Sequence, residues 1–254
     1  MSDIIIKTEN LSVTFNRNKA LEDCSFFARK CKITVILGDN GSGKTTLINA
    51  ITGNIKPNSG KIKIYDKEYP YLSVKQTINM GIHCVYQDLS LDGYKNSAEN
   101  IFLGNEPLKI GLFIDKKSMM QKAESLIKKL DINIPDLTVP VKYLSGGQKQ
   151  GVAIAKALNS EAKILILDEP TSAMGVKESK KTMEILKKLK YGDETLSQII
   201  ITHNIFWAFE IADEIAVMHL GKCIAHFDKE SSTPQQGHEF IWQGGKGEIG
   251  ECYE

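Results

Sequence analysis

A glycine-rich loop between an apolar run and a helical pattern constrains the fold of this chain most. The apolar run covers residues 33–37, and apolar residues recur at helical spacing over residues 45–51. The loop between them fits Gly-x-x-x-x-Gly-Lys-[Ser/Thr], which in a strand–loop–helix context predicts a phosphate-binding loop. Its residues are Gly38, Asp39, Asn40, Gly41, Ser42, Gly43, Lys44 and Thr45. This segment, called the phosphate loop below, places the chain among α/β proteins.

The phosphate loop also predicts separate roles for its backbone and its side chains. Glycines let the backbone turn its N–H groups inward, and the following helix start adds partial positive charge. We expect Lys44 to reach the terminal phosphates of a nucleotide and the Thr45 hydroxyl to bind Mg²⁺. We expect Thr46, the next residue, to contact the nucleotide as well. The alternative, a tight turn with no ligand, leaves the lysine and the threonine without a purpose.

Apolar runs and helical patterns alternate along most of the chain. Continuous apolar runs are typical of strands that are buried on both faces, and the helical patterns between them predict a mostly parallel sheet. The start of the chain instead has half-polar strand patterns separated by turns, which predict a small antiparallel sheet. The predicted parallel strands are 33–37, 82–86, 164–167, 199–202 and 215–218; the predicted antiparallel ones are 4–15, 20–30 and 61–65.

The middle of the chain has helical patterns alone. We expect no strand between residues 87 and 159, with Asp115 as the N-cap of one helix and another helix from Ser145 to Leu158. The predicted fold class is therefore α/β: a phosphate-loop nucleoside triphosphatase core with a mostly parallel sheet, a small antiparallel β subdomain and an inserted α-helical subdomain. In one domain of residues 1–254, residues 1–87 and 160–229 form the core, 88–159 the helical subdomain and 230–254 a C-terminal tail.

Composition limits the partners of the chain. The formal net charge of +1 over 254 residues gives no reason to expect a nucleic-acid partner. Five cysteines without Cys-x-x-Cys spacing predict reduced thiols rather than disulfides or zinc. The start of the chain lacks a signal-peptide pattern, and no apolar run is long enough to span a bilayer. If the protein functions at a membrane, we therefore expect it to do so through a partner chain.

Two acidic residues end the apolar run of residues 164–167. Unpaired buried charge is costly, so two carboxylates at the end of a buried strand indicate a function. We expect Asp168 to bind Mg²⁺, through water, and Glu169 to orient and polarise an attacking water molecule. A helix-capping role would account for Asp168 but would leave Glu169 unexplained.

The segment Leu144-Ser145-Gly146-Gly147-Gln148, called the signature segment below, lies shortly before those carboxylates. Together with the phosphate loop and Asp168-Glu169, it resembles the signature of the ABC-type ATPases. The resemblance runs from about residue 4 to about residue 225. It implies roles for three further residues: Phe15 would stack on adenine, Gln87 would bind Mg²⁺ and the attacking water, and His203 would contact the γ-phosphate.

The resemblance also implies a shared site. Ser145, Gly146, Gly147 and Gln148 would act on ATP held by the phosphate loop of a second subunit, so the chain would work as a homodimer or with a paired ATPase. ATP and Mg²⁺ would be its cofactors. Its partners would be a transmembrane permease and, indirectly, an extracytoplasmic solute-binding protein. It would lie in the cytoplasm, on the inner face of the membrane.

Three segments narrow the resemblance to monosaccharide importers of the ribose, xylose and fructose group: residues 86–91, 98–104 and 168–179. Most ABC ATPases have aspartate at the position of Gly175, so we assign Gly175 no catalytic role. Import of branched-chain amino acids, autoinducers or nucleosides is the nearest alternative, because the ATPase does not touch the cargo. A soluble ABC ATPase of DNA repair, translation or Fe–S assembly, or a regulatory module without catalysis, fits the sequence less well.

Overall fold

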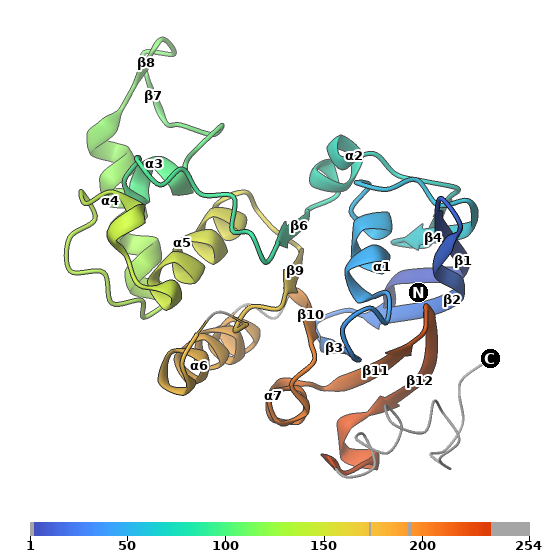
Figure 1. Ribbon diagram of the computed structural model, residues 1–254. Helices are drawn as coiled ribbons and strands as arrows, with labels where there is room; N and C mark the ends of the chain where they lie inside the picture. The colour runs from blue at the N-terminus through green and yellow to red at the C-terminus, as the bar shows by residue number, and fades with distance from the viewer. Residues whose placement is uncertain (1–2, 173, 193–194, 235–254) are drawn as a thin grey trace.

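The central element of the fold is a six-stranded sheet with strand order β12-β11-β3-β10-β9-β6 (Figure 1). The computed structural model describes residues 3–172, 174–192 and 195–234. Five strands are parallel, as predicted, and β12 joins the edge in the antiparallel direction. The strands are β3 (Ile33–Leu37), β6 (Ile82–Val85), β9 (Ile164–Asp168), β10 (Ser197–Thr202), β11 (Glu214–His219) and β12 (Lys222–Asp228). β12 was not predicted, because its half-exposed pattern lacks a continuous apolar run.

Side chains of the central sheet alternate between two apolar cores. In β10, Ile199 and Ile201 point into one core and Ile200 into the other, and all three are fully buried. This burial on both faces explains why the parallel strands are continuous apolar runs. The helices that accompany the sheet are α1 (Lys44–Ile51), α2 (Val74–Asn79), α6 (Val176–Gly192) and α7 (Ile205–Ile211).

A second, antiparallel sheet has strand order β2-β1-β4-β5 and lies beside α1 (Figure 1). Its strands are β1 (Ile4–Phe15), β2 (Asn18–Arg29), β4 (Ser59–Ile64) and β5 (Lys67–Tyr69). The prediction of a small antiparallel sheet is confirmed. One apolar core joins this sheet, α1 and one face of the central sheet, and it includes Phe26, Leu47 and Ile201.

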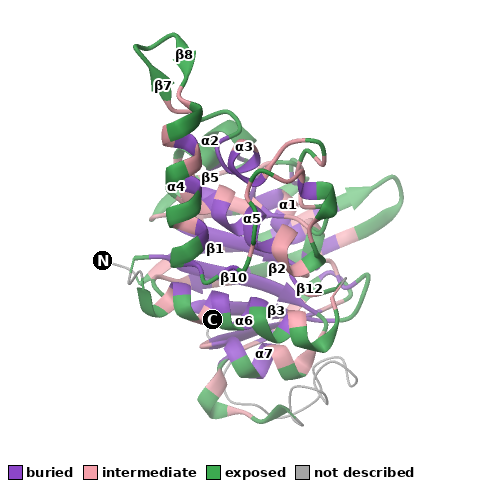
Figure 2. Ribbon diagram, turned by 90° about the vertical axis from the view of Figure 1, so that its left-hand side faces the viewer, coloured by how far each residue is buried: buried purple, intermediate pink, exposed green. Residues whose placement is uncertain are grey.

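The remaining helices form a separate lobe: α3 (Ser97–Ile101), α4 (Lys116–Lys129), the 3₁₀ turn Val141–Tyr143 and α5 (Gly146–Asn159) (Figure 1). The Asp115 side chain accepts a hydrogen bond from the Ser118 N–H at 3.0 Å, so the predicted N-cap is confirmed. The expectation that this region has no strand is wrong. A short hairpin of β7 (Leu108–Lys109) and β8 (Phe113–Ile114) extends from the end of the lobe (Figure 2).

The described residues bear on three further expectations. Cys24, Cys31 and Cys84 are free thiols, and burial raises the pKa of Cys24 and of Cys84 to about 12. Cys252 and most of the predicted tail lie outside the described residues; a 3₁₀ turn, Lys229–Ser231, precedes that part. Over the described part of the chain, no helix has the length and apolar character that crossing a membrane requires. The domain boundaries stay a prediction.

Candidate nucleotide-binding site

The carboxyl ends of the parallel strands bring most predicted site residues to one edge of the central sheet. Ile201 of β10 pairs with Asp168 of β9 on one side and with Ile36 of β3 on the other. The phosphate loop, Glu169 and His203 therefore emerge from adjacent strands. Ligands of open α/β sheets bind at this edge.

The phosphate loop is tightly packed against its surroundings. A Cβ on Gly38 would lie 2.3 Å from the Met218 carbonyl oxygen, and one on Gly43, whose φ is +102°, would lie 2.7 Å from the Ala20 carbonyl oxygen. Neither contact is compatible with a side chain. Gly43 is also the N-cap of α1 and supplies no side-chain hydrogen bond, so the first N–H groups of α1 keep their capacity to bind an anion.

Lys44 lies folded back over the phosphate loop and is 6 % exposed. Its Nζ donates hydrogen bonds to the carbonyl oxygens of Gly38, at 2.7 Å, and Asp39, at 2.8 Å. Burial lowers the pKa of Lys44, and the nearby carboxylates of Glu169 and Asp168 oppose that shift. The ammonium group is thus held beside the loop by two neutral acceptors, which phosphate oxygens could replace with charged ones.

Two buried polar groups of the site have no partner among the described residues: Asp168 Oδ1 and the Ser42 hydroxyl. Asp168 is 4 % exposed, and burial raises the pKa of its carboxyl, while a hydrogen bond from the Thr45 side chain opposes the shift. Orphaned buried polar groups usually mark a ligand, ion or water site. Asp168 and Thr45 therefore fit a magnesium ion, and no cluster of three metal-binding side chains occurs among the residues described. Mg²⁺ is commonly held by one or two protein groups together with substrate phosphates.

Glu169 has a strained backbone and a specific partner. Its φ is +50°, a region that non-glycine residues seldom adopt, and its N–H donates to the Ile201 carbonyl oxygen at 3.0 Å. The Glu169 Oε1 and the His203 Nδ1 lie 2.9 Å apart. His203 is half-exposed, whereas the Glu169 side chain is 11 % exposed. Strain of this kind is characteristic of functional sites, and the contact with His203 fixes the direction of the carboxylate.

Gln87 and Phe15 lie at the margins of the site. Gln87 is exposed and follows β6, whose Val85 pairs with Leu167 of β9, so it leaves the sheet on the same side as Asp168. Phe15 is 47 % exposed at the end of the β1–β2 hairpin. That hairpin also supplies Ala20, which abuts the phosphate loop. Both positions permit the predicted roles, which stay predictions.

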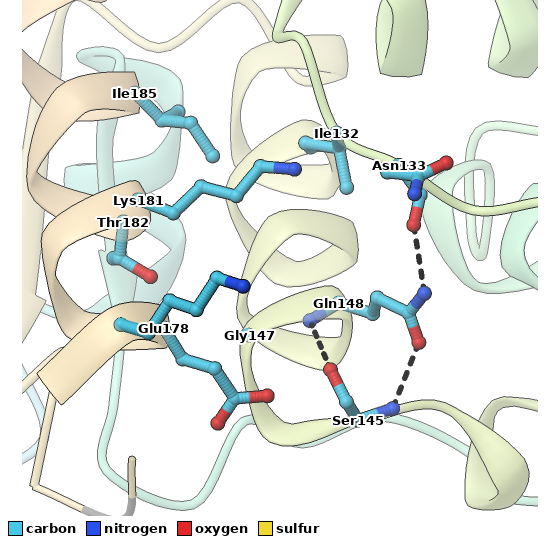
Figure 3. Close-up of a pocket in the computed structure, with 10 residues that line it drawn as sticks. Ile132, Asn133, Ser145, Gly147, Gln148, Glu178, Lys181, Thr182 and Ile185 are labelled. Carbon is cyan, nitrogen blue, oxygen red and sulfur yellow. Dashed lines mark hydrogen bonds between the residues drawn. The ribbon is translucent and has the colours of Figure 1, made fainter. Parts of the chain in front are cut away.

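The signature segment lies in the helical lobe, away from α1 (Figure 1). Ser145 is the N-cap of α5 and forms a capping box with Gln148: the Gln148 N–H donates to Ser145 Oγ, and the Ser145 N–H donates to Gln148 Oε1. The Gln148 amide also donates to the Asn133 carbonyl oxygen at 2.7 Å (Figure 3). These residues line a pocket of about 210 Å³ with Glu178 and Lys181 of α6. The Gln148 side chain is thus bonded within its own subunit, and its contact with a nucleotide stays a prediction.

Sequence reasoning missed two supports of the site. The Gly221 N–H donates to the Ser42 carbonyl oxygen at 2.9 Å and thereby ties the β11–β12 turn to the phosphate loop. Tyr86, next to Gln87, bonds through its hydroxyl to Thr52, at 2.9 Å, and to Asn54, both just after α1. A Leu-Gly turn and a lone tyrosine carry no signal that could have predicted these contacts.

Most of the chain is similar to known import ATP-binding proteins. Residues 21–172 match the family model described as ABC transporter. The chain is 39% identical to the xylose/arabinose import ATP-binding protein of Sulfolobus acidocaldarius, over 93% of this chain and 92% of that protein. It is 33% identical to the fructose import ATP-binding protein of Rhizobium meliloti, with 93% of each covered. The xylose import ATP-binding protein of Thermoanaerobacter pseudethanolicus is 39% identical, but the chain spans only 46% of it.

Solved structures of ATP-binding cassettes have the same fold as this chain. A nucleotide-free ATP-binding cassette from an ABC transporter superimposes with a TM-score of 0.78 at 27% identity, covering 89% of this chain and 91% of that one. A dimeric cassette in a post-hydrolysis state with ADP and Pi gives a TM-score of 0.76 at 25% identity, with 89% and 99% covered. With the family model, the near full-length relatives and the solved cassettes in agreement, this chain belongs to the ABC transporter family as an ATP-binding ATPase subunit.

Proposed function

We propose that the chain is the ATP-hydrolysing, energy-coupling subunit of an importer for a monosaccharide. One observation carries the sugar assignment: the xylose/arabinose import ATP-binding protein matches at 39% identity over nearly the full length of both chains. The three segments that resemble monosaccharide importers support it, and Gly175 lies in one of them. A Cβ on Gly175 would meet nothing within 4 Å, so lack of space does not account for the absence of aspartate there.

In the proposed reaction, water attacks the γ-phosphorus of ATP, and the bond to the oxygen bridging the β- and γ-phosphorus atoms breaks. Glu169 would orient the attacking water and draw its proton, while His203, 2.9 Å from that carboxylate, would keep it aimed and reach the γ-phosphate. Lys44 would exchange its two carbonyl partners for phosphate oxygens. Gln87 would bind the attacking water and Mg²⁺, and Phe15 would stack on adenine.

Asp168 and Thr45, whose side chains interact, would hold Mg²⁺ together with Gln87. When bound, Mg²⁺ would neutralise charge on the phosphates. The orphaned Asp168 Oδ1 supports a cation here, and the absence of a side-chain cap on α1 supports phosphate groups at the start of that helix.

The signature segment would complete the site from a second subunit. The hydroxyl of Ser145 and the N–H groups at the start of α5 form an anion-binding helix terminus in a different lobe from the phosphate loop. Two copies, or one copy and a paired ATPase, would therefore enclose two ATP molecules. The predicted subdomain of residues 88–159 would dock on a permease at the cytoplasmic face of the membrane, and an extracytoplasmic binding protein would deliver the sugar.

The test is reconstitution with a candidate permease and binding protein in proteoliposomes. We expect ATP hydrolysis and uptake to rise with xylose, arabinose, fructose or galactose, and Glu169→Gln to abolish both without dissociating the complex. If only branched-chain amino acids or nucleosides stimulated ATP hydrolysis and uptake, the chain would still serve an importer, but its cargo would not be a sugar. If the chain associated with no permease, the proposal that it serves an importer would be wrong.

A further inference from the structure

The hairpin at the end of the helical lobe exposes an unusual concentration of apolar side chains. Within residues 107–114, called the tip segment here, Ile110 is 87 % exposed, Leu112 79 % and Phe113 74 %; Leu108 and Ile114 are also exposed. The tip segment projects beyond the other elements of the lobe (Figures 1 and 2). Neighbouring exposed apolar side chains of this size mark interaction sites, whereas single ones need no explanation.

The residues in the turn of the hairpin are not the ones that would make this turn most stable. Ile110 and Gly111 both have positive φ, +54° and +73°, and the Leu112 N–H donates to the Lys109 carbonyl oxygen at 3.3 Å. This geometry is that of a type I′ turn, which favours Asn, Asp or Gly at the position of Ile110. A β-branched residue is strained there. Ile110 is thus unfavourable in two ways: its backbone is strained, and its apolar side chain is exposed to water.

Charge around the tip segment is unbalanced toward positive. Lys109, Lys116 and Lys117 are exposed, and among the described residues none of them has an ion-pair partner within 4.0 Å. Lys116 and Lys117 begin α4, where the helix dipole disfavours cations. The two nearby carboxylates are engaged locally. Asp115 caps α4, and Glu106 accepts hydrogen bonds from the backbone of residues 104 and 106, which lower its pKa.

We propose that the tip segment inserts into the interface of an anionic lipid bilayer. Its shape is convex, so apolar side chains enter the headgroup layer while the three lysines meet lipid phosphates. A protein partner would need a pocket that accepts several apolar side chains and is rimmed by acidic groups. The lipid contact explains together the exposed apolar residues, the strained isoleucine and the lysines at a helix start. It adds a direct membrane contact to the proposed attachment through a permease and does not depend on ATP hydrolysis.

The test is sedimentation of the full chain with vesicles of phosphatidylcholine, with and without phosphatidylglycerol. We expect binding to the anionic vesicles. Ile110→Asn should weaken it by at least about tenfold through lost apolar contact. The same change should leave the thermal unfolding midpoint unchanged or raise it, since asparagine suits the turn. Lys116→Glu combined with Lys117→Glu should abolish the preference for anionic vesicles without lowering stability.

Leu220→Asn is the matched control. Leu220 also has a positive φ, +45°, in a Leu-Gly turn and is 74 % exposed, but it lies at the β11–β12 turn rather than at the tip segment. Vesicle binding should survive this change. Failure of the native chain to bind anionic vesicles would overturn the proposal, as would equal losses for Ile110→Asn and Leu220→Asn. An Ile110→Asn protein that binds bare vesicles normally but no longer associates with the permease would replace the lipid with a protein partner.

Discussion

Replacing Asp168 by asparagine should stabilise the nucleotide-free protein while it abolishes turnover. Asp168 is 4 % exposed, its Oδ1 has no partner among the described residues, and burial raises the pKa of its carboxyl. A buried charged group that lacks a hydrogen bond costs at least about 1–3 kcal/mol, and the Thr45 hydrogen bond and the Lys44 charge offset part of this. We expect Asp168→Asn to raise the free energy of unfolding by about 1–2 kcal/mol at neutral pH.

The assay is thermal or urea unfolding without nucleotide and with a chelator. A gain of each kcal/mol should raise the melting temperature by about 2–4 °C in a chain of this size. Because the pKa of Asp168 is higher in the folded than in the unfolded state, ionisation destabilises the native protein above the folded pKa. This penalty disappears as the pH falls below the unfolded pKa. The difference between native protein and variant should therefore be largest at neutral pH and should shrink on acidification.

Mg²⁺ and ATP should reverse the order of stability. Ligand that binds only the folded state stabilises it by mass action, and the asparagine variant should lose most of this gain because it lacks the carboxylate. Asp66→Asn is the control: Asp66 lies in an exposed turn with φ of +67°, which both residues tolerate, so little change is expected. A less stable Asp168→Asn protein at neutral pH, or a difference that does not vary with pH, would refute the reasoning.

Three further substitutions test the predicted site. Glu169→Gln should lower the turnover number by at least about 10²–10⁴-fold, as expected for loss of a general base, yet retain ATP binding and stabilise the ATP-bound dimer in size-exclusion chromatography. Undiminished turnover would remove Glu169 from the mechanism. Lys44→Ala should weaken ATP affinity in calorimetry; unaltered affinity would contradict its placement on the phosphates. Phe15→Ala should weaken ATP binding by about 1–3 kcal/mol with little change in turnover at saturation, and an equal affinity for ATP would exclude stacking.

Local sequence patterns predicted the central sheet because its strands are buried on both faces. Residues 33–37, 164–167 and 199–202 became β3, β9 and β10 for that reason. Parallel neighbours then bring the phosphate loop, Asp168 and His203 to one edge, so part of the site geometry followed from the same patterns. The Asp115 cap was predictable too, since its hydrogen bond spans only three residues.

Other features depend on tertiary context. The tip segment contains an apolar run that would suit a buried strand, and composition cannot reveal that Ile110 and Phe113 face water. β12 became a strand because the edge of the central sheet was open to it. The bonds from Tyr86 to Thr52 and from Gly221 to Ser42 join segments that are remote in sequence, so no periodicity encodes them.

The predicted ATP site has one half in the core and one half in the helical lobe. The two halves differ in how many of their polar groups already have hydrogen-bond partners within one chain. In the core, Asp168 Oδ1 and the Ser42 hydroxyl are buried without partners in the described part of the chain, and Lys44 uses backbone carbonyl oxygens. In the lobe, Ser145 and Gln148 satisfy each other. Ligand binding should therefore organise the core half first, because that half gains the hydrogen bonds it lacks. The signature segment, already capped, can then close on the bound ligand as a rigid helix terminus, since its capping box needs no rearrangement.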